Sequence, residues 1–246
     1  MKISIITATY NSAATLQKTF DSVASQTYKD VEYVVVDGNS KDGTIDLIKK
    51  NESIISKWIS EPDKGIYDAI NKGIELASGD IIGLMHSDDF FANNEVLEKI
   101  ALAFQEGTDC IYGDLNYVDR DHPERIIRKW QSQDYNDSLF YEGWMPAHPT
   151  FYLRAKHYKK FGKYNLDFRI SADYELMLRM LVKNNLSSRY IPIVMVNMRV
   201  GGESNVTLKN RWLANQEDAK AWHLNNLKPK FYTRWAKPLS KLKQFF

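Results

Sequence analysis

The sequence predicts an α/β fold with a mostly parallel central sheet that is flanked by helices. Two observations support this prediction. Short apolar runs rich in β-branched residues, at 3–6, 31–36 and 81–85, have the length and composition of buried strands. The segments between these runs repeat apolar residues at helical spacing, as at Leu16 and Phe20. Buried strands that alternate with helices are typical of a parallel sheet covered on both faces.

The first 115 residues supply this alternation in order. Ser12 is expected to cap the first helix, and Asn93 or Asn94 is expected to begin the fourth. Gly79, after Ser78, terminates the third helix. We therefore expect strands at 3–6, 31–36, 54–60, 81–85 and 110–114, and helices at 12–23, 44–50, 66–77 and 93–105.

After about residue 115 the pattern changes to a mixed α+β portion. A hairpin is expected around the polar turn at 119–123, and the last long helix is expected to end near Asn225. The remaining elements are strands at 115–118, 126–130, 150–153 and 190–197, and helices at 135–141, 155–161, 171–181 and 207–225. The chain thus divides into residues 1–115, residues 116–226 and a tail at 227–246.

Composition and charge exclude several classes of protein. The chain has 246 residues, and its formal net charge of +2 gives no basic field of the kind that nucleic-acid binders show. The single cysteine, Cys110, excludes an internal disulfide and a multi-thiolate zinc site and fits a reducing compartment. No apolar run approaches the roughly 20 residues of a membrane span, and residues 1–7 turn polar too soon for a signal peptide. We therefore expect a soluble, cytoplasmic protein.

Two adjacent carboxylates, Asp88 and Asp89, follow the apolar run at 81–85. Ligands of an open α/β sheet bind outside the carboxyl ends of its strands, where these side chains are expected. Neighbouring carboxylates repel each other unless a cation is nearby, and Mg²⁺ and Mn²⁺ prefer oxygen ligands. The alternative is that the pair caps the next helix, because Asp is common at helix starts.

Polar segments also follow the first two strands, at 7–11 and 37–40, and a further motif, Asp-Lys-Gly-Ile-Tyr-Asp-Ala, begins at Asp63. Taken in order, these segments resemble glycosyltransferase family 2, the inverting enzymes with the GT-A fold of nucleotide-diphospho-sugar transferases. The resemblance is strong over residues 1–115 and weaker through Asp173 and residues 201–204. The variant Val-Val-Asp-Gly-Asn-Ser looks most like the branch that builds bacterial surface polysaccharides.

The resemblance implies a role for each part of the chain. Residues 1–115 would bind the nucleotide sugar and residues 116–226 the acceptor. Asp173 would be the catalytic base, and Asp88 and Asp89 would be the metal-binding pair for Mn²⁺ or Mg²⁺. Asp89 would be the direct ligand and Asp88 would lie near the ribose. Thr7, Thr9, Tyr10, Asp37 and Asp88 would bind the donor. Lys64, Asp68 and Arg199 are further candidates for donor binding, and His148 and Ser204 are candidates for contact with the acceptor or phosphate.

The residue types alone leave several roles open. An acid at a helix start, such as Asp173, caps a helix as readily as it acts as a base, and Glu175 is a competing base. Lys64 could bind a phosphate or be solvated, and a lone histidine such as His148 is more often structural. Arg199 could clamp a phosphate or lie in a glycine-rich turn. A surface carboxylate is the alternative for Asp68. Gly38 stands where the family commonly carries a second acid, which leaves the contact to the nucleobase open.

The function predicted from the resemblance is inverting transfer of a sugar from a nucleoside diphosphate sugar, a UDP-sugar being favoured. The acceptor would be a lipid-linked saccharide in O-antigen, capsule or exopolysaccharide synthesis. A non-catalytic nucleotide-sugar-binding homologue and a polyprenyl-phosphate glycosyltransferase are the alternatives. A nucleotidyltransferase or a dehydrogenase is disfavoured, because residues 7–12 lack the glycines of a phosphate-binding loop.

The tail at 227–246 differs from the rest of the chain. Its six basic residues are interleaved with aromatic and aliphatic ones, and it contains no acid. This pattern is typical of a segment that lies on a membrane surface, so we expect a peripheral protein on the inner face of the cell membrane. Pro238 would interrupt any helix there. The alternatives are an arm packed on the body and a disordered end.

Overall fold

A computed structural model describes residues 1–104, 107–201 and 208–233. The described chain forms one nine-stranded sheet in the order β3-β2-β1-β4-β8-β6-β9-β5, with β7 paired to β6. The pairings make six strands run in one direction, whereas β5, β7 and β8 run opposite to them. The predicted α/β fold with a mostly parallel sheet is therefore confirmed. The strands are β1 (Ile3–Thr9), β2 (Val31–Asp37), β3 (Lys57–Ser60), β4 (Ile81–Leu84), β5 (Phe90–Phe91), β6 (Cys110–Val118), β7 (Ile126–Trp130), β8 (Tyr152–Arg154) and β9 (Ser188–Arg199).

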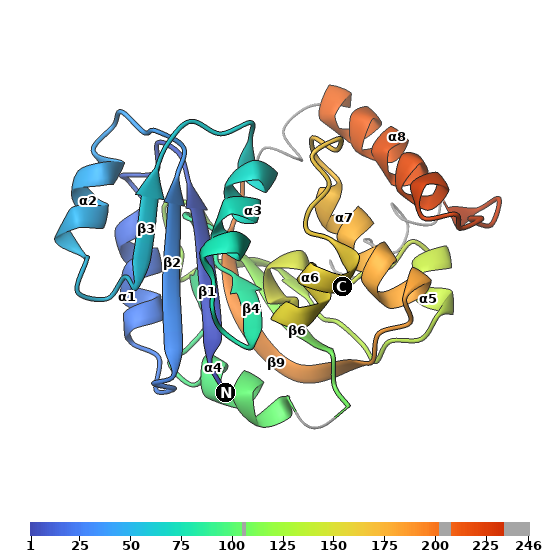
Figure 1. Cartoon of the computed structure of the whole chain (residues 1–246), viewed down its shortest axis with the longest axis horizontal. Helices are drawn as coiled ribbons and strands as arrows, with labels where there is room; N and C mark the ends of the chain where they lie inside the picture. The colour runs from blue at the N-terminus through green and yellow to red at the C-terminus, as the bar shows by residue number, and fades with distance from the viewer. Residues whose placement is uncertain (105–106, 202–207, 234–246) are drawn as a thin grey trace.

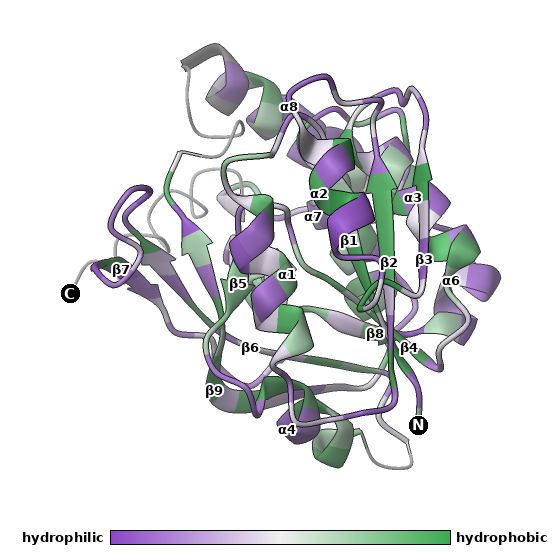
Figure 2. Ribbon diagram, turned by 90° about the vertical axis from the view of Figure 1, so that its left-hand side faces the viewer, coloured by the Kyte–Doolittle hydropathy of each residue, from purple (hydrophilic) through white to green (hydrophobic). Residues whose placement is uncertain are grey.

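Helices cover both faces of the sheet (Figure 1). Side chains alternate along each strand, so Ile6 and Val34 face the core beneath α3 and α7, whereas Ile5 and Val35 face α1, α2 and α4. Figure 2 shows the hydrophobic residues of β2 between these helices. The helices are α1 (Leu16–Ala24), α2 (Thr44–Lys50), α3 (Ile66–Leu76), α4 (Val96–Ala103), α5 (Ser138–Tyr141), η1 (His148–Thr150), α6 (Ala155–Phe161), α7 (Ala172–Met177), the π-helical η2 (Leu178–Lys183) and α8 (Leu208–Leu224).

The close approach of α3 to β1 depends on a glycine. A Cβ added to Gly73 would lie 2.4 Å from Cγ2 of Ile6, which is closer than real Cβ atoms approach a neighbour. The helix therefore packs against the strand without a side chain between their backbones. This packing brings the first turn of α3 to the carboxyl end of the sheet.

Several predicted boundaries were wrong for local reasons. Thr15 rather than Ser12 is the N-cap of α1, and the Ser12 hydroxyl lies 2.9 Å from that of Ser87. The fourth helix begins at Val96, because the Asn93 side chain accepts a hydrogen bond from Glu95 N–H in a turn before it. The third strand begins at Lys57 instead of residue 54, and the eighth at Tyr152 instead of residue 150.

Two predicted strands form one. Residues 110–114 and 115–118 belong to the single strand β6, whose pairing with β9 continues across register shifts at Asp114. The two-residue strand β5 was not predicted, and it pairs with β9. No helix in the described ranges is both long and apolar enough to cross a membrane.

Candidate active site

The strands β1, β2 and β4 end at the same edge of the sheet, which lies uppermost in Figure 1. Asp37, the last residue of β2, is fully buried there. Its carboxylate accepts hydrogen bonds from the N–H (3.0 Å) and hydroxyl (2.5 Å) of Ser40 and from the Ser60 hydroxyl (2.6 Å). Asp37 therefore holds the loop after β2 against the end of β3. Its contact with a nucleotide stays a prediction.

The three β1 residues predicted to bind the donor differ in exposure. The hydroxyl of Thr7 is fully buried, donates to the main-chain oxygen of Met85 (2.7 Å) and lies 2.9 Å from the Tyr33 hydroxyl. Thr9 is also buried, and its hydroxyl has no hydrogen-bond partner among the described residues. Tyr10 is 63% exposed and offers an open aromatic ring at the strand end. A ligand would reach Thr7 only if its neighbours moved.

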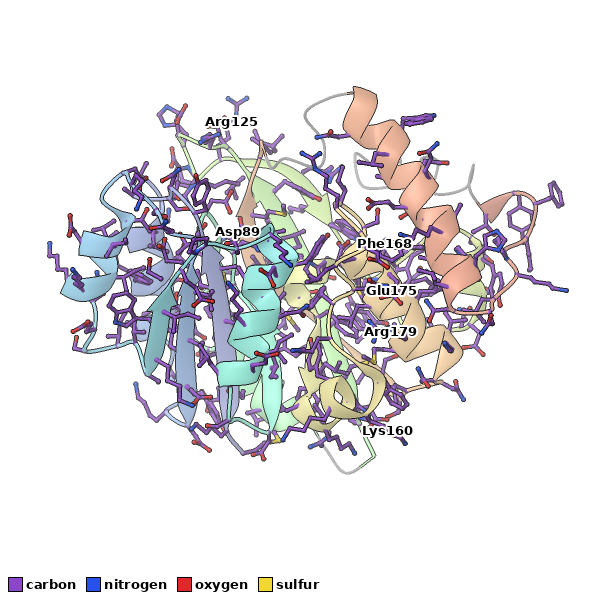
Figure 3. The ribbon with its side chains drawn as sticks, turned by 45° about the horizontal axis from the view of Figure 1, so that its top comes forward. Asp89, Arg125, Lys160, Phe168, Glu175 and Arg179 are labelled. Atoms are coloured by element: carbon purple, nitrogen blue, oxygen red, sulfur yellow. The ribbon has the colours of Figure 1, made fainter. Side chains whose placement is uncertain are left out.

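The acidic pair follows β4 in a tight turn, and its two members have different surroundings. Asp89, which Figure 3 labels, is almost fully buried, with 1% of the residue exposed. Its Oδ1 accepts a hydrogen bond from Arg199 N–H (3.1 Å), and its Oδ2 is buried with no hydrogen-bond partner among the described residues. Burial and the nearby Asp88 raise the pKa of Asp89 well above its usual range, and Arg199 opposes this shift. Asp88 is only partly buried, and no described residue donates a hydrogen bond to its carboxylate.

Arg199, at the end of β9, holds this turn in place. Its guanidinium donates to the main-chain oxygen of Asp88 and lies 5.5 Å from the ring centroid of Phe90. The side chain is largely buried, and its Nε has no hydrogen-bond partner among the described residues. The predicted contact of Arg199 with a phosphate remains untested.

The acidic pair offers the oxygen ligands that a hard divalent cation prefers. Within the described ranges no group of three or more His, Cys, Asp or Glu side chains surrounds a common point. Mg²⁺-type sites commonly use one or two carboxylates and complete their shell with water and substrate phosphates, so a full protein cage is not required. The unpaired oxygens of Asp88 and Asp89 fit such a cation, and Asp88 is the more accessible of the two.

Asp173, the predicted base, lies in the first turn of α7 with 24% of its side chain exposed. The Tyr67 hydroxyl, from α3, lies 3.3 Å from its Oδ1 and donates more closely to the main-chain oxygen of Ile170 (2.6 Å). Nδ1 of His148 lies 3.8 Å from its Oδ2. The N-cap of α7 is Ser171, and the described contacts of the Asp173 carboxylate are with α3 and η1. The role of Asp173 as the base stays a prediction.

His86 and Tyr164 complete the cluster around Asp173, and neither was predicted as a site residue. The ring centroid of His86 lies 5.7 Å from that of His148, and the Tyr164 hydroxyl lies 2.9 Å from Nε2 of His148. The ring of Tyr164 also stacks on that of Tyr67 at 5.6 Å. His86 precedes Asp88 by two residues, so the histidine pair connects the acidic turn to Asp173. In the sequence, the only indication of this histidine pair was the presence of His86 just before the acidic motif.

Glu175, the competing base, is buried in an ion pair (Figure 3). Arg179 donates to both of its carboxylate oxygens at 2.9 Å, and Asn225 donates to Oε1 at 3.0 Å. A bidentate buried pair of this kind has a structural role. We therefore assign Glu175 to the packing of α7 against α8.

Glu217, from α8, positions the start of α7. Its carboxylate accepts hydrogen bonds from the N–H groups of three successive residues at 2.8–2.9 Å, namely Arg169, Ile170 and Ser171. The side chain is 7% exposed. The segment that carries Asp173 is thus fixed from a helix more than 40 residues away in the chain, a contact that the sequence pattern did not reveal.

Two further predicted donor-binding residues are Lys64, in the loop before α3, and Asp68, in the first turn of that helix. The N–H of Lys64 donates to Oδ2 of Asp68 (3.0 Å), and Asp68 lies 3.8 Å from Nζ of Lys72. Asp68 therefore shapes the loop, whereas the Lys64 residue is exposed. Ser204 lies outside the described residues.

Comparison with known families identifies the family of this chain. The model of a family described as Glycosyl transferase family 2 matches residues 4–179. The chain belongs to glycosyltransferase family 2. Relatives described as PGL/p-HBAD biosynthesis glycosyltransferases, from Mycobacterium bovis and Mycobacterium tuberculosis, are each 30% identical over 220 residues, which is 85% of this chain and 82% of theirs. An uncharacterised glycosyltransferase of Mycobacterium tuberculosis is 33% identical over 181 residues, covering 72% of this chain and 68% of the relative.

Solved structures share the fold of this family 2 glycosyltransferase. Residues 1–349 of S. aureus TarS, in complex with UDP-GlcNAc, match with a TM-score of 0.68 and 18% identity over 92% of this chain and 65% of theirs. This chain spans 44% of a longer TarS structure. The mannosyltransferase PcManGT of Pyrobaculum calidifontis, in complex with GDP-Man and Mn²⁺, matches with a TM-score of 0.67 and 16% identity over 98% of this chain and 73% of that one. These likenesses support the GT-A fold.

The environment of His148 predicts a pH dependence of the stability of the glycosyltransferase. Burial, opposed by Asp173 and reinforced by His86, lowers the pKa of His148 to about 4. The unfolded chain would protonate His148 near pH 6.5, so it binds more protons than the folded chain between pH 6.5 and 4. The contribution of His148 to stability is therefore present above pH 6.5 and lost as the pH falls toward 4.

Urea unfolding of the wild type and of His148→Gln, followed at pH 7.5, 6 and 5, checks this prediction. The free energy of unfolding of the wild type should fall more steeply than that of the variant between pH 7.5 and 5. Equal slopes for the two proteins would show that His148 does not titrate as its burial requires.

Proposed function

We propose that this glycosyltransferase moves a sugar from a nucleoside diphosphate sugar, a UDP-sugar being favoured, to a hydroxyl of a lipid-linked saccharide with inversion at the anomeric carbon. The observation that supports this most is the cluster at the sheet edge, where a partly exposed Asp173 lies beside His148, whose ring contacts that of His86 from the acidic turn. An inverting transfer requires a carboxylate that takes the proton of the acceptor hydroxyl. It also requires acids that bind the cation at the leaving diphosphate, close to that carboxylate.

Asp173 acts as the general base in this proposal. The acceptor oxygen attacks the anomeric carbon from the face opposite the nucleoside diphosphate, forming one C–O bond as the other breaks. The leaving diphosphate keeps the bonding electron pair, and the proton of the acceptor hydroxyl passes to the Asp173 carboxylate. The Tyr67 hydroxyl, 3.3 Å from Oδ1, and Nδ1 of His148, 3.8 Å from Oδ2, border that carboxylate and limit its orientation.

The acidic turn binds the leaving group. A divalent cation bound there supplies Lewis-acid stabilisation of the negative charge on the departing diphosphate. The exposure of the two acids favours Asp88 as the carboxylate that meets the cation, and Asp89 as the acid that fixes the turn to β9 through Arg199. The family resemblance instead implies that Asp89 is the direct ligand of the cation.

The relatives support the donor and acceptor classes of this proposal. The TarS structure holds UDP-GlcNAc and PcManGT holds GDP-Man, which supports a nucleoside diphosphate sugar as the donor. The mycobacterial relatives are named for PGL/p-HBAD biosynthesis, which supports a lipid-linked acceptor. A screen of UDP-, GDP- and dTDP-sugars with a lipid-linked saccharide and Mn²⁺ tests this function. We expect transfer from one donor, with the inverted anomeric configuration of the product seen by NMR. A product with retained anomeric configuration, or no transfer from any donor, would contradict the proposed function.

The membrane proposal rests on the tail at 227–246. In its described part, Phe231 is 92% exposed and Lys228 and Lys230 are exposed, while Leu227 packs against the core and Thr233 is buried. The first seven residues thus combine an anchor on the body with an exposed aromatic and basic surface. The rest of the tail, which adds four basic residues, lies outside the described residues.

We predict that a chain truncated after Thr233 loses affinity for vesicles containing anionic phosphatidylglycerol. Each basic residue near an anionic surface contributes about 1 kcal/mol, so the loss should be at least about tenfold in a sedimentation assay. Zwitterionic vesicles, which neither protein should bind tightly, are the control. Unchanged binding of the truncated chain to anionic vesicles would remove residues 234–246 from the membrane contact.

A further inference from the structure

A second acid lies over the carboxyl end of β2. Gly38 follows β2 directly, and a Cβ built on it would lie 2.4 Å from Oδ2 of Asp63 and 3.3 Å from Cδ2 of Tyr10. The carboxylate of Asp63 and the exposed ring of Tyr10 therefore border the space that a side chain at position 38 would occupy. Asp63 itself comes from the loop between β3 and α3.

The two acids at this strand end differ in what they can offer to a ligand. Asp37 is fully buried, and both of its oxygens accept hydrogen bonds from Ser40 and Ser60. Asp63 is only partly buried, and its Oδ1 accepts a hydrogen bond from Gly65 N–H at 2.8 Å. This bond fixes the carboxylate while no described residue donates to Oδ2. Of these two acids, Asp63 is therefore the one with a carboxylate oxygen, Oδ2, that can accept a hydrogen bond from a ligand.

We propose that Asp63 determines the nucleobase specificity of the donor by accepting a hydrogen bond from a ring N–H group of the base. The inference rests on the proposed function, because it requires a nucleoside diphosphate at the carboxyl ends of the strands. Uracil at N3 and guanine at N1 carry such a ring N–H. Cytosine and adenine present a ring nitrogen with a lone pair on the corresponding edge, which the Asp63 carboxylate repels.

Tyr10 would orient the base for this contact. Its exposed ring borders the same space as Asp63, so a base lying against the ring would present its edge to Oδ2. Gly38 keeps that space open. A larger residue at position 38 would displace the Asp63 carboxylate, although the carboxylate is a side-chain end and could move.

Isothermal titration with UDP, GDP and CDP in the presence of Mn²⁺ tests the proposal on the whole chain. The wild type should bind UDP or GDP more tightly than CDP, and the two arms identify which base the site prefers. Asp63→Asn keeps an oxygen for Gly65 N–H but replaces Oδ2 by an amide N–H₂. We expect the affinity for the preferred nucleotide to fall by about 10- to 100-fold, the size of a lost hydrogen bond to a charged group. The affinity for CDP should change less, because the amide can donate to the cytosine ring nitrogen.

Two further variants separate a nucleobase contact from a role in the loop. Glu61→Gln changes an exposed acid of the same loop that pairs with Lys72, and it should leave all three affinities unchanged. Gly38→Ala should weaken binding of the preferred nucleotide in the same direction as Asp63→Asn. The double variant should be no weaker than Asp63→Asn alone, since both changes act on one contact.

The outcomes distinguish this inference from the proposed function. Equal losses for UDP, GDP and CDP in Asp63→Asn, or no loss at all, would overturn the role of Asp63 while leaving the glycosyltransferase reaction intact. Preference of the wild type for CDP would overturn it as well. Failure of the wild type to bind any of the three nucleotides would overturn the proposed function, and this inference with it.

Discussion

Replacing Asp173 by Asn is expected to lower the rate of sugar transfer by about 10²- to 10⁴-fold, the usual contribution of a general base. The amide keeps the shape and an oxygen toward Tyr67, so the cluster with His148 should persist. It cannot accept the proton of the acceptor hydroxyl at neutral pH. Donor affinity should stay near that of the wild type, because Asp173 faces the acceptor in this proposal. Steady-state transfer and calorimetry of the donor measure the two quantities separately.

Asp167→Asn is the matched control for this prediction. Asp167 is an exposed acid six residues before Asp173, and the same change of acid to amide there should leave transfer unchanged. Transfer by Asp173→Asn within a few-fold of the wild type would exclude Asp173 as the base. If neither the wild type nor the variant turned over any donor that both bind, the chain would be a binding homologue.

The fold was largely predictable because its main signals are local. The helices Thr44–Lys50 and Ala155–Phe161 have the predicted bounds, since turn residues and apolar spacing lie within each segment. The two-residue strand at Phe90 has no such signal. It exists because it pairs with Asn197, more than 100 residues further along the chain. Elements that depend on a distant partner are those that a sequence pattern does not specify.

The same contrast applies to the site. Strand ends of a parallel sheet meet at one edge, so the sequence predicted the neighbourhood of Asp37, the acidic pair and Tyr10. The partners of the Asp173 carboxylate come instead from two other parts of the chain, α3 and η1, and Tyr67 is 106 residues away from it. Glu217, which fixes the backbone before α7, lies 46 residues after Ser171. These long-range contacts turn a helix-start acid into a positioned carboxylate.

Replacing Asp88 by Asn should lower transfer by about 10²- to 10³-fold and abolish the effect of Mn²⁺ on UDP affinity. The reason is that the partly exposed carboxylate of Asp88 carries a formal charge that an amide lacks, and a hard cation binds a neutral amide more weakly than a carboxylate. Calorimetry of UDP with Mn²⁺ and with a chelator measures this effect. In the wild type, the chelator should weaken UDP binding at least about tenfold.

Asp89→Asn separates the roles of the two acids, because it makes the same acid-to-amide change one residue away. Its Oδ1 can still accept the hydrogen bond from Arg199 N–H, and its side chain is 1% exposed, so the turn should keep its shape. If Asp88 is the acid that meets the cation, Asp89→Asn should retain a clear dependence of UDP affinity on Mn²⁺. The opposite pattern, with the dependence lost in Asp89→Asn and kept in Asp88→Asn, would mean that Asp89 leaves its enclosure when the donor binds. The buried oxygen Oδ2, which has no partner among the described residues, would then be a ligand released by that movement.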